Sequence, residues 1–503
     1  GGSTGMRRIH SSLADPTWCA LSAMRTLSMG FQVMKLRQIL FVLFAVTTTV
    51  VSATDTTDIP DIGADDTSVR ATAKSSSVMG ADLSNAPRVD VDKPVEFIPL
   101  YMRDKRIFGF TSFQSLVDAA PAGSTLRPKP GFYVGPVLLT KPLIIDGGGK
   151  VTIDGGDKGT VFVISTNGST VRGLHLTGSG PSHDTDDACL NVRGNSNVIE
   201  NNEIDNCLFG IDLKQSNLNI VRGNSIRSKP FELGMRGDGI RLWYSMENRI
   251  ENNRVVDSRD NVAWYSNRNV FYHNYGARSR YSLHFMFANN NIVDGNHYYD
   301  NAVGVYLMYN SNTVLRNNVI SHSNGPTGMG IGFKESSGTL IEGNEIIYCS
   351  LGISSDLSPY QPDSEIVLKN NRIAYNGVAI AFNSDMTGWV VHGNSFVGNI
   401  SNVSVSGSGS EKRNDWRGNF WDDYQGFDRN NDGHGDTTYD LYAYADRIWM
   451  EIPQASFFKV APALEVLDFL ERLAPFSSPT LILRDEKPLF NNPWKREGRE
   501  IEQ

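Results

Sequence analysis

An internal repeat in the middle of the chain constrains the fold more than any other feature. A unit of the form G-I-x-L-x-x-(S/N)-x-x-x-(V/I)-x-x-N-N/G-N recurs, as in "VGVYLMYNSNTVLRNNVI". Its closing asparagine falls at nine positions: Asn202, Asn224, Asn253, Asn274, Asn296, Asn318, Asn344, Asn371 and Asn394. The intervals are 22, 29, 21, 22, 22, 26, 27 and 23 residues, so a coil of 22 residues tolerates insertions at particular corners. Such a repeat indicates a solenoid, whose coils bury a shared core by stacking.

The segments between these asparagines resemble short β-strands. Each unit holds two or three runs rich in Val, Ile and Leu, broken by Asn and Gly. We therefore predict an all-β fold over residues 91–410, a right-handed parallel β-helix with about 22 residues per coil. Asparagine tolerates left-handed backbone at corners, and stacked asparagine side chains can hydrogen-bond along the axis. A short helix from Thr111 or Ser112 to about Ala120 should cap the open end.

Side chains along each strand of such a coil alternate between the core and the outer face. Aligning the coils on their Gly-Ile step places Val262, Trp264, Leu283 and Phe285 in the core. One outward file then contains Asp212, Arg241, Ala263, His284, Tyr306, Gly332 and Ser354. The next outward file contains Lys214, Trp243, Tyr265, Met286, Met308, Lys334 and Asp356. The outer face around "YSLHFMFANN" therefore carries an imidazole beside thioethers.

Three of these outward side chains form a candidate metal site. Adjacent coils lie about 4.8 Å apart and alternate residues of a strand about 6.5–7 Å apart, so His284, Met286 and Met308 can converge. One imidazole and two thioethers are a soft ligand set, which suits transiently bound Cu(I) better than Ca²⁺ or Mg²⁺. Trp243 and Tyr265 extend the second file into an aromatic patch that suits partner docking. The competing interpretation is a dry protein–protein interface in which methionine only packs.

The same files also admit an enzyme. Asp212, Arg241, His284 and Tyr306 share one outward file. In a β-helix that acts on uronic-acid polymers, arginine would neutralise a carboxylate while histidine or tyrosine moves a proton. A polysaccharide lyase, an epimerase or a carbohydrate-binding protein is therefore the alternative function.

A second candidate site follows the repeats. "DRNNDGHGD" places Asp428, Asn430, Asp432 and Asp436 at positions 1, 3, 5 and 9 of a loop similar to an EF-hand. Position 12 is Tyr439 instead of glutamate, so the bidentate ligand is missing. These oxygen donors predict a structural Ca²⁺ site, and the alternative is an Asx-turn loop held by its own hydrogen bonds.

The C-terminal extension, residues 411–503, changes character in its second half. Between Pro462 and Pro475, leucines recur at helical spacing. The apolar positions exceed one helix face; they include Phe457, Phe458, Leu464, Leu467, Leu470 and Leu473. We predict amphipathic helices that dock into a membrane protein. The alternative is a helix packed on the last coil.

The N-terminal segment is typical of an exported protein. "MKLRQILFVLFAV", which begins at Met34, joins basic residues to an apolar run, and "VSA" ends at Ala53 with the small residues that signal peptidase requires. We therefore expect an upstream extension and signal peptide over residues 1–53. Residues 54–90 are rich in Asp, Thr, Ser and Ala and are expected to be a disordered linker.

Net charge and cysteine spacing limit the classes of partner and of metal or disulfide site that this chain can have. The formal net charge is -8 and the sequence has no basic stripe, which argues against a nucleic-acid partner. Cys189, Cys207 and Cys349 match neither a disulfide framework nor a zinc pattern, so we expect three buried thiols.

Four segments together resemble the NosD family, the periplasmic β-helix proteins of nitrous-oxide reductase maturation. They are "PGFYVGPVLLTKPLIIDGGGKVTIDGG", the coil pair "SLHFMFANN…GNHYYDNAVGVYLMYNSN", "GNFWDDYQGFDRNNDGHGDTTYD" and "YADRIWMEIPQASFFKVAPALEVLDFLERLAPFSSP". The resemblance covers roughly residues 90–490. Its C-terminal part is the more specific, because the β-helix part also fits the wider carbohydrate-binding superfamily.

The resemblance implies a non-catalytic subunit of an ABC transporter complex, seated on a dimeric permease with a cytoplasmic ATPase. It also implies supply of copper or sulfur to apo nitrous-oxide reductase, with a copper chaperone lipoprotein as partner. In that case the phenylalanine-rich C-terminal helices bind the permease, and His284, Met286 and Met308 bind the copper ion that the chaperone delivers. The sequence contains no P-loop, so ATP hydrolysis is expected on another subunit.

Overall fold

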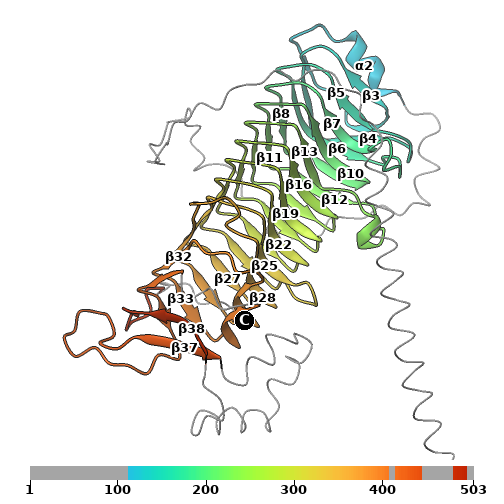
Figure 1. The fold of residues 1–503 in the computed structure, drawn as a ribbon. Coiled ribbons are helices and arrows are strands. Elements are labelled where there is room, and N and C mark those ends of the chain that lie inside the picture. Colours follow the sequence, from blue (N-terminus) through green and yellow to red (C-terminus); the bar gives the residue numbers. More distant parts are fainter. Residues whose placement is uncertain (1–110, 407–413, 444–479, 495–503) are drawn as a thin grey trace, which may run out of the picture. The chain divides into compact units, whose positions relative to one another are not determined.

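The computed structural model describes residues 111–406, 414–443 and 480–494, and it confirms the right-handed parallel β-helix (Figure 1). One side of the solenoid is a parallel sheet of twelve strands, each paired with strands of the adjacent coils. Its strands are β3 (Val137–Leu139), β5 (Phe162–Ile164), β7 (Ala188–Val192), β10 (Phe209–Lys214), β13 (Ile240–Trp243), β16 (Asp260–Trp264), β19 (Tyr281–Met286), β22 (Val303–Met308), β25 (Met329–Lys334), β28 (Leu351–Asp356), β31 (Val378–Phe382) and β34 (Ser401–Val405).

A second sheet of 24 strands supplies the other sides of the coils in two rows. The first row is β1 (Thr125–Leu126), β4 (Ile144–Asp154), β6 (Thr170–Thr177), β8 (Val198–Glu200), β11 (Ile220–Arg222), β14 (Arg249–Glu251), β17 (Val270–Tyr272), β20 (Ile292–Asp294), β23 (Val314–Arg316), β26 (Leu340–Glu342), β29 (Ile366–Lys369), β32 (Trp389–His392) and β35 (Asp415–Arg417). The second row is β2 (Gly131–Val134), β9 (Glu203–Cys207), β12 (Ser225–Ser228), β15 (Arg254–Val256), β18 (Tyr275–Ala277), β21 (His297–Tyr299), β24 (Val319–Ser321), β27 (Glu345–Ile347), β30 (Arg372–Ala374), β33 (Ser395–Val397) and β36 (Phe420–Trp421). The stacked strands therefore continue past residue 410.

Both ends of the solenoid are covered. The predicted cap helix is α2 (Phe113–Ala119), which buries Phe113 and Val117. At the other end, β37 (Tyr439–Ala443) and β38 (Thr480–Asp485) form an antiparallel pair. A continuous cluster of buried apolar side chains runs from Phe113 to Leu483, so the stacked coils share one core.

The recurrent asparagines form the predicted ladder. From Asn202 to Asn394, each side-chain Nδ2 donates to the Oδ1 of the asparagine in the next coil at 2.8–3.0 Å. Asn419, which lies beyond the predicted repeats, is the last member. The left-handed residue is the one before each closing asparagine, for example Asn317 with φ 56° and Gly343 with φ 64°. The ladder thus satisfies buried amides while the preceding residue turns the corner.

The predicted register is wrong in one coil. The structure pairs Val262 with Arg241 and Trp264 with Trp243, so Val262 and Trp264 point outward while Ala263 is buried. The reason is the 21-residue interval: this coil is one residue short, and a register shift between β16 and β19 restores the alignment. Trp264 therefore takes the place predicted for Tyr265 in the second outward file.

The cysteines differ from the expectation of three thiols. One winding of the chain, from β7 through β8 to β9, brings the Cα atoms of Cys189 and Cys207 to 5.5 Å, and the two residues pair as a disulfide. Cys349 is a buried free thiol, and burial raises its pKa to about 11.

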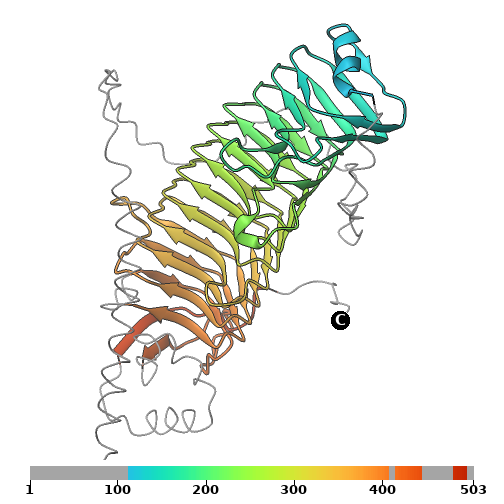
Figure 2. The ribbon, with the colours of Figure 1, turned by 90° about the vertical axis from the view of Figure 1, so that its right-hand side faces the viewer.

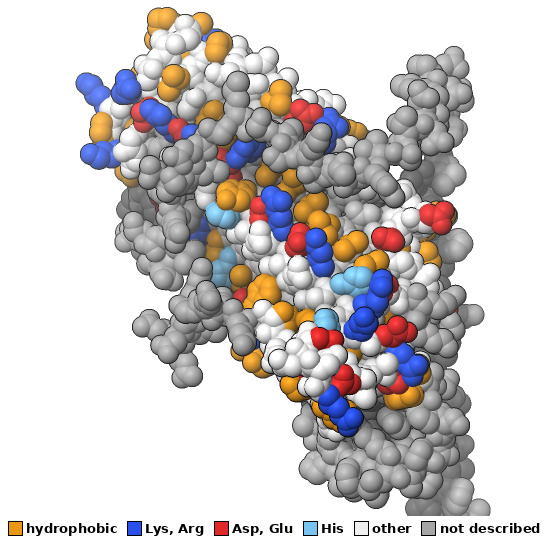
Figure 3. Space-filling model, turned by 90° about the vertical axis from the view of Figure 1, so that its left-hand side faces the viewer, with side chains coloured by type: hydrophobic (Ala, Val, Ile, Leu, Met, Phe, Trp, Pro, Cys, Tyr) orange, Lys and Arg blue, Asp and Glu red, His pale blue; other side chains and the backbone are white. Residues whose placement is uncertain are grey.

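Charged side chains on the outer surface pair between coils. Figure 3 shows Lys and Arg beside Asp and Glu on one side of the solenoid, with apolar side chains between them. Arg222 lies 2.7 Å from Glu200, and Arg316 lies 2.8 Å from Asp294. Opposite charges on that side of the surface therefore alternate along the stack instead of forming a field of one sign.

Candidate functional site

Loop length determines which part of the twelve-stranded sheet is left open. The loops that precede β7 and β13 are long, residues 178–187 and 229–239, and the second contains the 3₁₀ helix η3 (Leu233–Met235). Figure 2 shows this short helix, in green, in front of the coils on the side that faces the viewer. Only three residues precede each of β16, β19 and β22, and the seven-residue loop 322–328 follows before β25. The outer faces of β16, β19 and β22 thus form a window between longer loops.

His284 and Met308 are in contact in this window. The His284 Nε2 atom lies 3.2 Å from the Met308 Sδ atom, across β19 and β22. Met286 is the register partner of Met308, so both thioethers belong to one file. The structure thus brings the three predicted ligands to one place on the outer face.

Aromatic rings and burial set the state of the imidazole. Tyr281 lies 4.8 Å and Tyr306 5.9 Å from His284, measured between ring centroids, and the two tyrosine rings stack on each other. Burial lowers the pKa of His284 to about 4, because a charged ring would lose its hydration there. At neutral pH the imidazole is therefore uncharged and can use a nitrogen lone pair as a ligand.

Tyr265 lies at the turn after β16, not in the second outward file. Its backbone has φ 49°, and its ring stacks between those of Tyr244 and Phe287 at 4.8 and 5.1 Å. Phe287 in turn stacks on Tyr309. We call Tyr244, Tyr265, Phe287 and Tyr309 the corner stack. Its rings run along the edge of the window, and Tyr244 and Phe287 are exposed at 44% and 39%.

Trp264 is the window residue that the sequence analysis missed. Its pairing places it between Trp243 and Met286 in the second outward file. The centroids of Trp243 and Trp264 are 5.1 Å apart in an edge-on arrangement. Trp243 also lies 5.9 Å from Tyr265, so the predicted aromatic patch exists but has a further member. The 21-residue interval between Asn253 and Asn274 indicates that this coil lacks one residue, but it does not show at which position the residue is missing.

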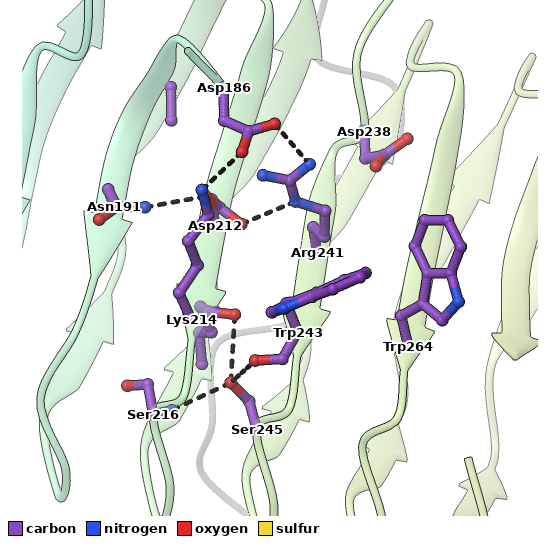
Figure 4. Close-up of polar contacts among 12 residues, drawn as sticks. Asp186, Asn191, Asp212, Lys214, Ser216, Asp238, Arg241, Trp243, Ser245 and Trp264 are labelled. Carbon is purple, nitrogen blue, oxygen red and sulfur yellow. Dashed lines mark hydrogen bonds and ion pairs between the residues drawn. The ribbon is translucent and has the colours of Figure 1, made fainter. Parts of the chain in front are cut away.

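An ion-pair cluster borders the window on the side of β10 and β13 (Figure 4). Arg241 donates through Nε to Asp212 at 2.8 Å and through Nη1 to Asp186 at 2.9 Å. Lys214 donates to Asp186 at 2.6 Å, and Asn191 donates to the fully buried Asp212 at 2.8 Å. Burial opposes the charge of Arg241, but its bonds to Asp212 and Asp186 outweigh that effect and raise its pKa. Asp186, Lys214 and Arg241 of this cluster line a pocket of about 400 Å³ together with Trp243.

The arrangement of this cluster bears on the enzyme alternative. Asp212 and Arg241 are adjacent in the first outward file, and so are His284 and Tyr306, but Val262 separates the two pairs. The two carboxylates of the cluster bind Nε and Nη1 of Arg241, and its Nη2 atom is buried without a hydrogen-bond partner among the described residues. A substrate carboxylate would have to compete with them for this arginine.

The carboxylates of the loop at 428–436 bond to the loop itself. Asp428 accepts the backbone N–H of Asp432 at 3.1 Å and of Gly433 at 2.9 Å, and Asp436 accepts that of Arg429 at 2.8 Å. Asn430 also accepts the Asp432 N–H and donates to its carboxylate. In the described part of the chain, no three or more His, Cys, Asp or Glu side chains gather as a metal-holding group. Calcium binding at Asp428, Asn430, Asp432 and Asp436 stays a prediction.

Other predictions fall outside the described residues. These are the signal peptide and linker over residues 1–90 and the docking positions Phe457, Phe458, Leu464, Leu467, Leu470 and Leu473. Within the described ranges, no helix combines the length and apolar character needed to cross a membrane.

Comparison with known proteins identifies similar sequences across the window. The family model of the periplasmic copper-binding protein NosD matches residues 227–426, and a model of the right-handed β-helix region matches residues 159–275. A probable ABC transporter binding protein NosD from Pseudomonas aeruginosa is 28% identical over 425 residues, which cover 72% of this chain and 87% of that protein. The protein of the same description from Stutzerimonas stutzeri is 34% identical over 131 residues, 26% of this chain and 30% of that protein.

Solved β-helices are more distant. The A-module of the mannuronan C-5 epimerase AlgE6 from Azotobacter vinelandii is 18% identical and aligns with a TM-score of 0.49. That alignment covers 59% of this chain and 95% of the module.

Proposed function

This chain belongs to the NosD family, and from that membership we propose that it is a periplasmic, non-enzymatic subunit of an ABC transporter complex. In this proposal it receives or relays Cu(I) for metallocentre assembly of nitrous-oxide reductase. The ATPase resides on another subunit and acts through the permease. In a variant of this function, the complex couples ATP hydrolysis to the supply of sulfur for the metallocentre, and the copper site is not used.

The single observation that best supports a copper role is the contact of His284 with Met308. In zinc sites, nitrogen and sulfur ligands lie about 2.0 and 2.3 Å from the metal. Two such atoms 3.2 Å apart can share one ion of similar size without a large rearrangement. Met286, in the same file as Met308, supplies the second thioether.

Charge also favours a monovalent soft ion. The two thioethers carry no charge, and the lowered pKa of His284 keeps the imidazole neutral at pH 7. Neutral soft ligands suit Cu(I), whereas Ca²⁺ and Mg²⁺ require oxygen donors.

The surroundings of the window supply a docking surface for the copper chaperone. The corner stack and Trp243 present aromatic rings beside the ligands, and aromatic side chains dominate binding energy at protein interfaces. Apo nitrous-oxide reductase is the recipient in this proposal. The permease dimer binds the C-terminal helices through Phe457, Phe458, Leu464, Leu467, Leu470 and Leu473.

The polysaccharide alternative has weaker support. Arg241, which would bind a substrate carboxylate, is already paired with Asp186 and Asp212. Val262 also separates Arg241 from His284 in the first outward file. Incubation with alginate-type polymers should therefore yield neither unsaturated ends nor epimerised residues.

Anaerobic competition titration with Cu(I) tests the site. The double variant Met286→Leu, Met308→Leu keeps the apolar volume and should lower Cu(I) affinity by about tenfold or more without a large change in melting temperature. Met235→Leu, which removes an exposed thioether in η3, is the matched control and should bind as the parent does. Equal affinities of the double variant and the parent would remove the site assignment.

Permease docking needs a test that spares the solenoid. Truncation before Phe457 would also remove β38, which covers the end of the core. Leu467→Asp with Leu470→Asp in the full chain should abolish co-purification with the permease and leave the melting temperature unchanged. Retained co-purification would refute docking through these helices.

A further inference from the structure

We propose that Trp264 is a fourth group of the copper site, where its indole ring covers the bound monovalent ion. The inference rests on the proposed function. Trp264 pairs with Met286, which pairs with Met308, so the indole and both thioethers occupy consecutive strands of one file. Consecutive strands lie about 4.8 Å apart, which brings an indole ring within reach of an ion at Met286.

The polar edge of this indole is not used by the fold. Among the described residues, the Trp264 Nε1 atom is buried and has no hydrogen-bond partner. A buried indole N–H normally finds an acceptor, and an unpaired one needs an explanation. Figure 4 shows the Trp264 ring lying beside Trp243, whose edge-on contact at 5.1 Å fixes it from one side. The fold thus leaves the Trp264 N–H group without an acceptor, while Trp243 packs against the ring.

An indole face has the chemistry to bind such an ion. Tryptophan is the strongest of the aromatic side chains in cation–π contacts, which form within about 6 Å of the ring centroid and strengthen when water is excluded. The face offers no lone pair, so it does not complete the square-planar nitrogen and oxygen set that Cu(II) prefers. Trp264 would therefore favour Cu(I) and Ag(I) over Cu(II) while it keeps water from the open side.

The competing explanation is that Trp264 only packs against Trp243 as part of the docking surface. The two explanations differ in the response of the indole to metal. A ring that covers the ion changes its emission when the ion binds, whereas a packing ring does not.

Titration of the full chain with Ag(I), an air-stable probe for Cu(I), separates them. Binding should quench tryptophan emission in the parent. Trp264→Leu should remove most of this quench and lower Ag(I) affinity by about 2- to 30-fold. Trp264→Phe keeps an aromatic face, so its affinity should stay closer to that of the parent while the quench is lost. Trp494→Leu removes a partly exposed indole from the segment that contacts β33, and it should retain both quench and affinity.

The outcomes distinguish the inference from the function beneath it. If Trp264→Phe keeps the full quench, or Trp264→Leu keeps the parent affinity, the inference fails, while a loss of affinity in Met286→Leu, Met308→Leu still supports the copper site. If the parent binds neither Ag(I) nor Cu(I), both proposals fail. A melting curve of each variant shows whether it is folded. If Trp264→Leu does not fold, the quench measured in Trp264→Phe tests the inference.

Discussion

Asp485 ends the asparagine ladder by accepting from Asn419. Its Oδ2 atom lies 2.9 Å from the Asn419 backbone nitrogen and 3.2 Å from the Asn419 Nδ2 atom. The same fully buried carboxylate accepts Trp421 Nε1 and the backbone N–H groups of Gly418 and Lys487. A residue of β38 thus satisfies the amides that the last coil would otherwise leave unpaired.

Replacement of Asp485 by alanine should destabilise the solenoid. Several buried donors would lose their acceptor, and each such loss costs about 1–3 kcal/mol, so we expect the free energy of unfolding to fall by about 3 kcal/mol or more. Denaturant unfolding measures it. Asp440→Ala on the paired strand β37, which removes an outer ion pair with Arg484 and a hydrogen bond from Tyr442, should lower the free energy of unfolding much less. Equal effects of the two variants would show that Asp485 is not a cap.

The ion-pair cluster should be sensitive to loss of its arginine. Arg241→Met leaves the buried Asp212 without its closest cationic partner, for which we expect a loss of about 3–5 kcal/mol in the free energy of unfolding. Arg268→Met breaks the exposed ion pair with Glu247 and should change the free energy of unfolding by no more than about 1 kcal/mol. A small effect of Arg241→Met would mean that water or Lys214 compensates for the missing guanidinium.

Burial of His284 predicts a pH dependence of stability. Its pKa in the folded chain is about 4, below the ordinary value of 6.5, so the unfolded chain binds this proton more tightly. The free energy of unfolding should therefore decrease as the pH falls from about 6.5 to about 4. His284→Gln should remove this contribution, as judged from urea unfolding at several pH values.

A second variant identifies the cause of that dependence. Met308→Leu removes the contact to Nε2 but keeps the ring buried, so it should retain the pH dependence of the parent. Loss of the dependence in Met308→Leu would assign it to the sulfur contact instead of burial.

The periodic part of the structure was predictable from the sequence, because stacking repeats one environment in every coil. The asparagine ladder follows from spacing alone, and the pairing of β19 with β22 follows from two successive coils of equal length. The misplacement of Trp264 and Tyr265 arose in the short coil, since an interval of 21 residues does not say where the residue is missing. A one-residue slip reverses the facing of every side chain in the strand.

Features made by non-repeating segments were not predictable. Asp186 reaches Arg241 from loop 178–187, an insertion at a corner where β16, β19 and β22 are preceded by only three residues. Cys189 and Cys207 are 18 residues apart in the sequence, and only the winding of the chain brings them together. Asp485 is separated from Asn419 by 66 residues, so no local pattern links the cap to the ladder.

X-ray absorption of the Cu(I)-loaded protein identifies the atoms that bind copper. We expect one nitrogen and two sulfur neighbours, and loss of the sulfur scattering in Met286→Leu, Met308→Leu. A spectrum with only nitrogen and oxygen neighbours, or one that the double substitution leaves unchanged, would contradict this assignment.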